Sequence, residues 1–172
     1  MGKRIVIGAL SFVGYVGTVL GANWAITRFG IVPVGFGLMA PAGVYFAGLA
    51  FSLRDATQET LGRLWAIAAI LVGAAVSTLI DPALGVASGA AFLVSEFADF
   101  AVYTPLRRRN YLAAVGLSNT VGAVLDSAVF LWLAFGSLDF MVGQVWGKLL
   151  MTLPVVAVLY LVRYRLPVAK GA

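Results

Sequence analysis

Four ionisable side chains stand inside long apolar runs of this chain, and their chemistry is the first thing to explain. They are Glu96, Asp99, Asp126 and Lys148. An ionised group at the centre of a membrane span costs about 2.5–3.5 kcal/mol even on the lenient insertion scale, so such groups normally face a bundle interior or a water-filled cavity. We therefore expect an internal polar site.

The spacing of the acidic residues places them on one stripe of a helix. Ser95, Asp99 and Tyr103 follow one another at i+4, and Glu96 lies three residues before Asp99. Residues three and four apart are neighbours on a helix surface. The stripe predicts a helix that turns an acidic face toward the interior.

Two further helices carry polar positions at helical spacing. Asn119 and Asp126 are seven residues apart, and Gln144 and Lys148 are four apart. At a rise of about 1.5 Å per residue, Asp126 and Lys148 each lie roughly 20 Å or slightly more from the cytoplasmic ends of their spans, so they could pair. Such a pair would be either a structural ion pair or an element of coupling and gating.

A second polar layer is expected nearer the cytoplasm. Glu96 and Asn119 both come out about 10 Å from that end, and the sequence places no cation inside the membrane at this depth. Carboxylates without a cation at the same depth favour binding of a cationic or donor-rich ligand. The alternatives are a protonated carboxyl bonded to its neighbour, or Asp99 reaching the cluster Arg107–Arg109.

Hydrogen-bonding capacity limits what this layer could bind. A carboxylate only accepts, and it pairs well with two parallel N–H donors, as a guanine-type edge presents them. Asn119 can donate and accept, which suits a neighbouring carbonyl group. Tyr103 and nearby phenylalanines could supply a stacking face, or they could contact lipid.

Composition assigns the chain to a class. It has 172 residues, 62% of them hydrophobic and 11% charged, with a mean hydropathy of +0.99. That is more apolar material than one soluble core of this size could hide, so we expect a membrane protein. The net charge of +5 then marks the cytoplasmic face of a bilayer rather than a nucleic-acid partner, because no aromatic platform accompanies the arginines.

The missing residue types exclude several chemistries. The chain has no cysteine and no histidine, which removes thiol nucleophiles, His-based triads and zinc sites of the usual kind. The motif GQVWGK, residues 143–148, is one residue too short between its glycines for a phosphate-binding loop and continues with Leu149. We expect no enzyme activity, no metal and no cofactor.

The expected fold is all-α, a polytopic protein of the cell membrane with six transmembrane helices in a single domain. A span needs about 20 apolar residues, and charged or turn-forming segments divide the chain at five places, giving Ile5–Thr27, Ile31–Leu53, Leu64–Ile80, Ala83–Tyr103, Tyr111–Phe135 and Met141–Arg163. Except for Lys148, every lysine and arginine but one falls on the same side of this arrangement. Both termini should therefore be cytoplasmic.

Glycine and proline predict local departures from straight helices. Pro33, Gly35, Gly37, Pro41 and Gly43 crowd the start of the second span, which should be bent or broken. Three pairs of glycines in GxxxG spacing, at 17/21, 85/89 and 143/147, are expected to let helices approach one another closely. We expect them to pack neighbours within the chain more often than to form a homo-oligomer.

The residues also resemble a known family. The runs SEFADFAVYTPLRRR (95–109), SNTVGAVLDSAVF (118–130) and GQVWGK, with RDATQETLGR (54–63), look like those of the vitamin uptake transporter (VUT) family, also called queuosine precursor transporters. The likeness extends over nearly the whole chain. It also identifies Asp55 and Glu59 as a cytoplasmic loop motif, although we favour the simpler interpretation that both are solvated loop charges.

The resemblance implies uptake of 7-cyano-7-deazaguanine or its aminomethyl relative, purine-like precursors of a modified base. Glu96 and Asp99 would bind the base edge, while Asn119 and Asp126 would complete the pocket between the fourth, fifth and sixth helices. An alternative is a substrate-capture subunit of a multi-protein importer with a separate ATPase. A third reading is a membrane scaffold that transports nothing.

Overall fold

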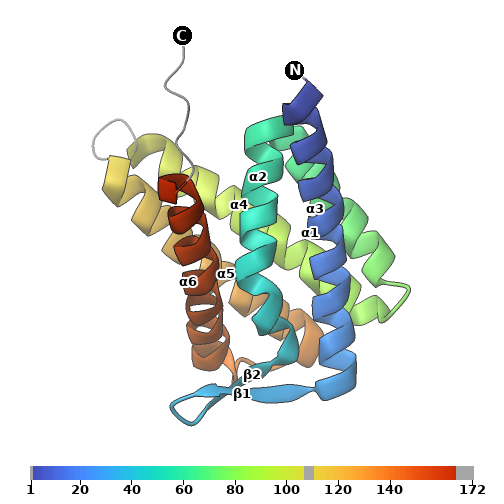
Figure 1. Ribbon diagram of the computed structural model, residues 1–172. Coiled ribbons are helices and arrows are strands. Elements are labelled where there is room, and N and C mark those ends of the chain that lie inside the picture. Colours follow the sequence, from blue (N-terminus) through green and yellow to red (C-terminus); the bar gives the residue numbers. More distant parts are fainter. Residues whose placement is uncertain (1, 107–110, 166–172) are drawn as a thin grey trace.

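The computed structural model describes residues 2–106 and 111–165. For positions 3, 99–100, 103–104, 111–116, 118–119 and 155–165 it describes the backbone alone. Within these ranges the chain forms six α-helices and one short β-hairpin (Figure 1).

The first helix is the longest. α1 spans Gly2–Phe29 and ends where Gly30 takes a left-handed backbone conformation, with φ at +64°. Its apolar stretch Arg4–Phe29 is, among the described residues, the one helix long and apolar enough to cross a membrane by length and composition. Three shorter apolar helical stretches accompany it: Arg63–Ser77, Pro82–Ala98 and Thr120–Phe135. The six-span arrangement therefore stays a prediction.

The segment predicted as the second span, Ile31–Leu53, is not a continuous helix. It begins as an antiparallel hairpin of β1 (Ile31–Gly35) and β2 (Leu38–Pro41), continues as a 3₁₀ turn, η1 (Ala42–Phe46), and only then becomes α2 (Ala47–Leu61). The break expected from proline and glycine is present but larger than a bend. Proline lacks the N–H that a helix needs, and the hairpin turn requires positive φ angles that glycine adopts freely.

The later start of α2 moves its end as well. α2 continues through residues 54–61, which were expected to form a cytoplasmic loop, and Gly62 with φ at +100° separates it from α3 (Arg63–Ser77). Asp55 and Glu59 thus lie on the last turns of a helix, and the loop assignment is wrong. The residues between Arg54 and Leu61 contain neither glycine nor proline, so the helix has no reason to end earlier.

The remaining helices lie close to their expected positions. α4 spans Pro82–Leu106, α5 spans Tyr111–Phe135 and α6 spans Met141–Arg165. α4 packs most extensively against α5, α1 packs against α2 and α3, and α2 packs against α6. The start of α1 and the end of α6 lie at the same end of the bundle, and the hairpin lies at the opposite end (Figure 1).

The hairpin is anchored to the side of α6. A Cβ on Gly143 would overlap the carbonyl oxygen of Met39, and a Cβ on Gly147 would press on Val44. Trp146 donates its indole N–H to the Val34 carbonyl at 3.2 Å. The glycine pair at 143/147 therefore accommodates β2 and η1 rather than another helix.

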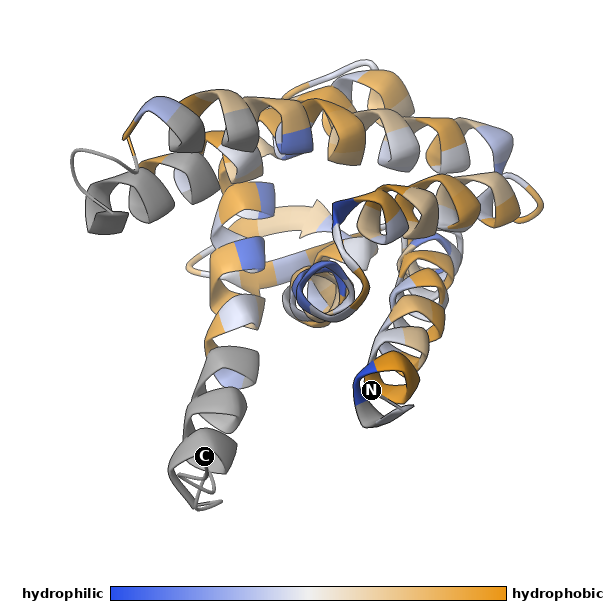
Figure 2. Ribbon diagram, turned by 90° about the horizontal axis from the view of Figure 1, so that it is seen from above, coloured by the Kyte–Doolittle hydropathy of each residue, from blue (hydrophilic) through white to orange (hydrophobic). Residues whose placement is uncertain are grey.

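Large apolar side chains are exposed over much of the molecule. Small and polar residues fill much of the interior, while many large apolar side chains are exposed, as at Leu64 (82%), Leu79 (84%) and Trp132 (62%). Apolar colour predominates along the helices in Figure 2. Exposed apolar surface of this extent marks contact with lipid or with another protein.

Candidate functional site: a central cavity

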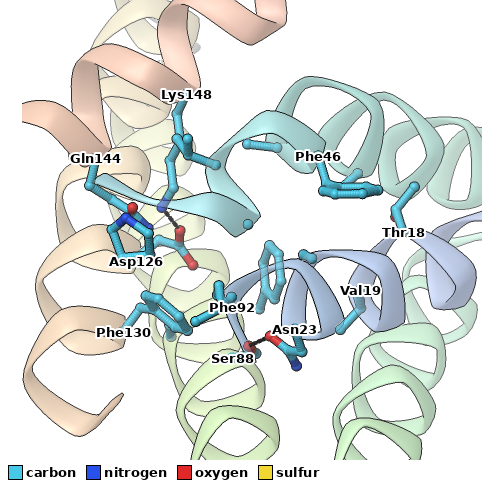
Figure 3. A pocket seen from close by; sticks show the side chains of 18 of the residues that line it. Thr18, Val19, Asn23, Phe46, Ser88, Phe92, Asp126, Phe130, Gln144 and Lys148 are labelled. Atoms are coloured by element: carbon cyan, nitrogen blue, oxygen red, sulfur yellow. Dashed lines mark hydrogen bonds and ion pairs between the residues drawn. The ribbon is translucent and has the colours of Figure 1, made fainter. Parts of the chain in front are cut away.

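An open cavity lies in the middle of the bundle, bordered by α1, η1, α2, α4, α5 and α6 (Figure 3). Its empty volume, including the open space at its mouth, is about 560 Å³. Most of its wall is apolar, with phenylalanines from four elements. Its lining consists of Thr18, Val19, Ala22, Asn23, Ile26, Pro41, Gly43, Val44, Phe46, Ala47, Ala50, Phe51, Ser88, Ala91, Phe92, Asp126, Phe130, Gln144 and Lys148.

Aromatic contacts hold part of this wall in place. The rings of Phe92 and Tyr15 form an edge-to-face pair with a centroid distance of 5.8 Å and an interplanar angle of 66°. The rings of Phe92 and Phe51 form a second such pair, at 6.4 Å and 86°. Edge-to-face pairs of this kind are favourable beyond their buried area. They fix the Phe92 ring, which lines the cavity, as a rigid aromatic surface.

A buried ion pair forms the most polar part of the wall. Lys148 of α6 donates to a carboxylate oxygen of Asp126 on α5, and both side chains are 7% exposed. Lys148 also donates to the Ser127 hydroxyl at 2.9 Å. The pairing of Asp126 with Lys148, which their similar depth along the two helices allowed, is thus present. Because opposite charges neutralise each other here, the pair leaves the cavity without a net charge from these residues.

Two amide side chains bring further polar groups to the cavity. Asn23 of α1 is 1% exposed and Gln144 of α6 is 4% exposed. The Ser88 hydroxyl donates to Oδ1 of Asn23 at 3.0 Å. The Nδ2 atom of Asn23 and the Oε1 atom of Gln144 have no hydrogen-bond partner among the described residues.

Sequence reasoning missed Asn23. It placed Gln144 on a polar stripe without assigning it a role. A signal for Asn23 existed, because an amide within a long apolar helix is costly in lipid and normally faces the interior, as an ionised group does. The prediction of a polar site was built on the ionised residues and did not include the amide of Asn23.

Glu96 does not line the cavity. Its carboxylate forms an ion pair with the guanidinium of Arg54 on α2, and these side chains are 13% and 19% exposed. The expectation that no cation lies beside Glu96 is therefore wrong. The sequence predicts Arg54 in a loop on the cytoplasmic side. In the structure α2 extends past this residue and carries it into the bundle.

The Arg54–Glu96 pair lies beside the cavity, toward the chain termini. Arg54 follows the lining residue Phe51 by three positions, and Glu96 follows Phe92 by four, so each lies about one helical turn beyond the cavity. Both helices lead away from the hairpin at this point (Figure 1). The pair joins α2 to α4 on that side.

Three other predicted site residues cannot be placed around the cavity. Asp99 and Tyr103 lie on α4 and Asn119 lies on α5, but their side chains are outside the part of the chain that the structure describes. Their proposed contacts with a substrate stay predictions.

The acidic residues near the end of α2 lie away from the cavity. Asp55 is largely exposed, and its carboxylate lies 2.9 Å from Nε of Arg54. The backbone carbonyl of Glu59 accepts from the Arg4 guanidinium at 2.7 Å, which ties the start of α1 to the end of α2. Asp55 and Glu59 lie on the predicted cytoplasmic side, further along α2 than its cavity-lining residues.

These features define a class of protein: a bundle of helices with an apolar exterior and a central cavity whose wall carries buried polar groups.

Residues 80–162 match a family described as "Putative vitamin uptake transporter". The match covers α4, α5 and most of α6, just under half of the chain. This is a family of transporters and not of enzymes. Comparison with the curated proteins and with the solved structures gave no match.

Proposed function

We propose that this protein carries a small, uncharged, planar solute across the cell membrane through the central cavity, and that the solute is a 7-deazaguanine such as 7-cyano-7-deazaguanine. The observation that carries the proposal is the composition of the cavity wall. It combines aromatic side chains with hydrogen-bonding amides, and its two opposite charges neutralise each other.

Each part of that wall suits such a solute. A planar heterocycle can lie against the ring of Phe92, which its own aromatic contacts hold in place. Polar groups on its edge can pair with amides that have unused hydrogen-bonding capacity. The match of residues 80–162 to a family of vitamin transporters supports a solute of metabolite size.

The proposal changes the role assigned to Glu96. Glu96 is paired with Arg54 and lies outside the cavity lining, so in this state it does not face a solute in the cavity. Glu96 is a candidate ligand only in a state of the transporter in which it has separated from Arg54. Asp126 is likewise already paired, in its case with Lys148, although Asp126 does border the cavity.

The test is rescue of a cell that cannot make the deazaguanine precursor. The chain is expressed in that cell, 7-cyano-7-deazaguanine is supplied at low concentration, and the modified base is measured in tRNA. Rescue is expected. A well-inserted protein that gives no modified base would overturn the assignment of this solute.

Reconstitution separates a self-sufficient carrier from a capture subunit that needs an ATPase. The purified chain is placed in liposomes, and uptake of labelled 7-cyano-7-deazaguanine is measured without any other protein. Accumulation or exchange by the chain alone excludes the ATPase-dependent reading. Binding without any transport, together with stoichiometric co-purification of an ATPase from the native membrane, would support it.

A further inference from the structure

Two side chains that line the cavity each carry a buried polar atom without a hydrogen-bond partner. Among the described residues, four buried side-chain atoms lack one: the hydroxyl oxygens of Tyr15 and Ser77, Nδ2 of Asn23 and Oε1 of Gln144. Asn23 and Gln144 line the cavity, whereas Tyr15 and Ser77 do not. An unpaired buried polar atom costs about 1–3 kcal/mol. A fold that leaves two of them beside one cavity points to a ligand that pairs with both.

The free atom of Asn23 is a donor. Its oxygen already accepts from the Ser88 hydroxyl, a contact between α1 and α4 that also fixes the rotation of the amide. The amino group is what remains. Ser88 thus acts as a positioning residue, because it keeps the Asn23 oxygen occupied.

The free atom of Gln144 is an acceptor. Gln144 lies one helical turn before Lys148 on α6 and is therefore next to the buried ion pair. The Lys148 ammonium already donates to Asp126 and Ser127. The acceptor on Gln144 is consequently left for a donor that comes from outside the chain.

We propose that Asn23 and Gln144 are the specificity-determining residues of the cavity, Asn23 donating to an acceptor of the solute and Gln144 accepting from one of its donors. The inference rests on the proposed function and names the residues that select the solute. It predicts a neutral ligand with a donor and an acceptor on its periphery. A carboxylate or phosphate would find no free cation on the described wall, since the lysine there is already paired.

Variants of similar size test this assignment. Asn23→Leu and Gln144→Met remove the polar groups and keep most of the side-chain volume, and Ser77→Ala removes an equally buried, unpartnered hydroxyl away from the cavity. Binding of 7-cyano-7-deazaguanine to each purified protein is measured by calorimetry in detergent. Loss of one hydrogen bond to the solute should weaken binding about tenfold to a hundredfold in each cavity variant. Ser77→Ala should bind like the wild type.

A ligand-free measurement completes the test. If the unpaired atom of Gln144 serves the ligand and not the fold, the unliganded Gln144→Met protein should unfold at a temperature no lower than the wild type. Asn23→Leu also removes the acceptor of the Ser88 hydroxyl and should unfold at a lower temperature. Should Asn23→Leu fail to insert, Asn23→Ala takes its place. Wild-type binding that survives within about twofold in both cavity variants overturns the inference and leaves the proposed function intact. A folded wild type that binds no deazaguanine overturns the proposed function, and this inference with it.

Discussion

The guanidinium of Arg54 on α2 pairs with the carboxylate of Glu96 on α4, about one turn from the cavity on the side of the chain termini. Without Arg54 the Glu96 carboxylate would lose its paired cation, whereas Arg54 without Glu96 would keep the Asp55 carboxylate beside its Nε atom. A second ion pair between helices, Asp126 with Lys148, borders the cavity itself. The fold thus places a neutralised charge pair at two levels of its interior.

The Arg54–Glu96 pair should be energetically coupled. Arg54→Gln and Glu96→Gln each break this ion pair and should lower the unfolding temperature in detergent micelles. The double variant should recover part of the loss, with a coupling energy of about 0.5–3 kcal/mol. Strictly additive effects in this double-mutant cycle would show that the two side chains do not interact.

Removing one member of the Asp126–Lys148 pair should be costly. Asp126→Leu or Lys148→Met alone leaves a buried charge, and about 3–5 kcal/mol of stability should be lost. The double variant replaces the pair with apolar groups and should fold. It should nevertheless lose most uptake of 7-cyano-7-deazaguanine in liposomes, because both residues line the cavity. Normal uptake by the double variant would identify the pair as purely structural.

Two glycines of α1 and α6 provide a matched comparison. Gly143→Ala would bring a methyl group onto the Met39 carbonyl of the hairpin, and it should cost about 1–3 kcal/mol of stability. Gly17 has nothing within 4 Å of the position that its Cβ would take. Gly17→Ala should leave the unfolding temperature unchanged or raise it, since alanine favours the helix. Equal effects of the two substitutions would contradict the close approach of β2 to α6.

Cysteine labelling checks the predicted orientation. The chain has no cysteine of its own, so single cysteines at Phe36 on the hairpin and at Gln58 near the end of α2 report on opposite ends of the bundle. Both positions are exposed. A membrane-impermeant maleimide added to intact cells should label Phe36→Cys and should reach Gln58→Cys only after permeabilisation. The reverse pattern would place the termini outside the cell.

The sequence by itself determined the class of the protein and the number of its helices. Apolar runs separated by charges locate helices because backbone groups in lipid must be satisfied within the segment. Ionised groups inside those runs pointed to an interior polar site for the same reason. The pairing of Asp126 with Lys148 followed from helix depth, because rise per residue converts sequence position into distance along the bundle.

Only the tertiary structure decided which polar groups meet. Residues 31–41 fold as a hairpin, so α2 starts later and carries Arg54 into the bundle opposite Glu96, a partner 42 positions away in the chain. Asn23 became part of the cavity because α1 packs beside α4 and brings it to Ser88. Local propensity says where a helix can form, but the rotation and depth of each helix depend on packing across the whole bundle. That packing pairs Glu96 with Arg54 and places an aromatic cavity with buried amides about one turn away.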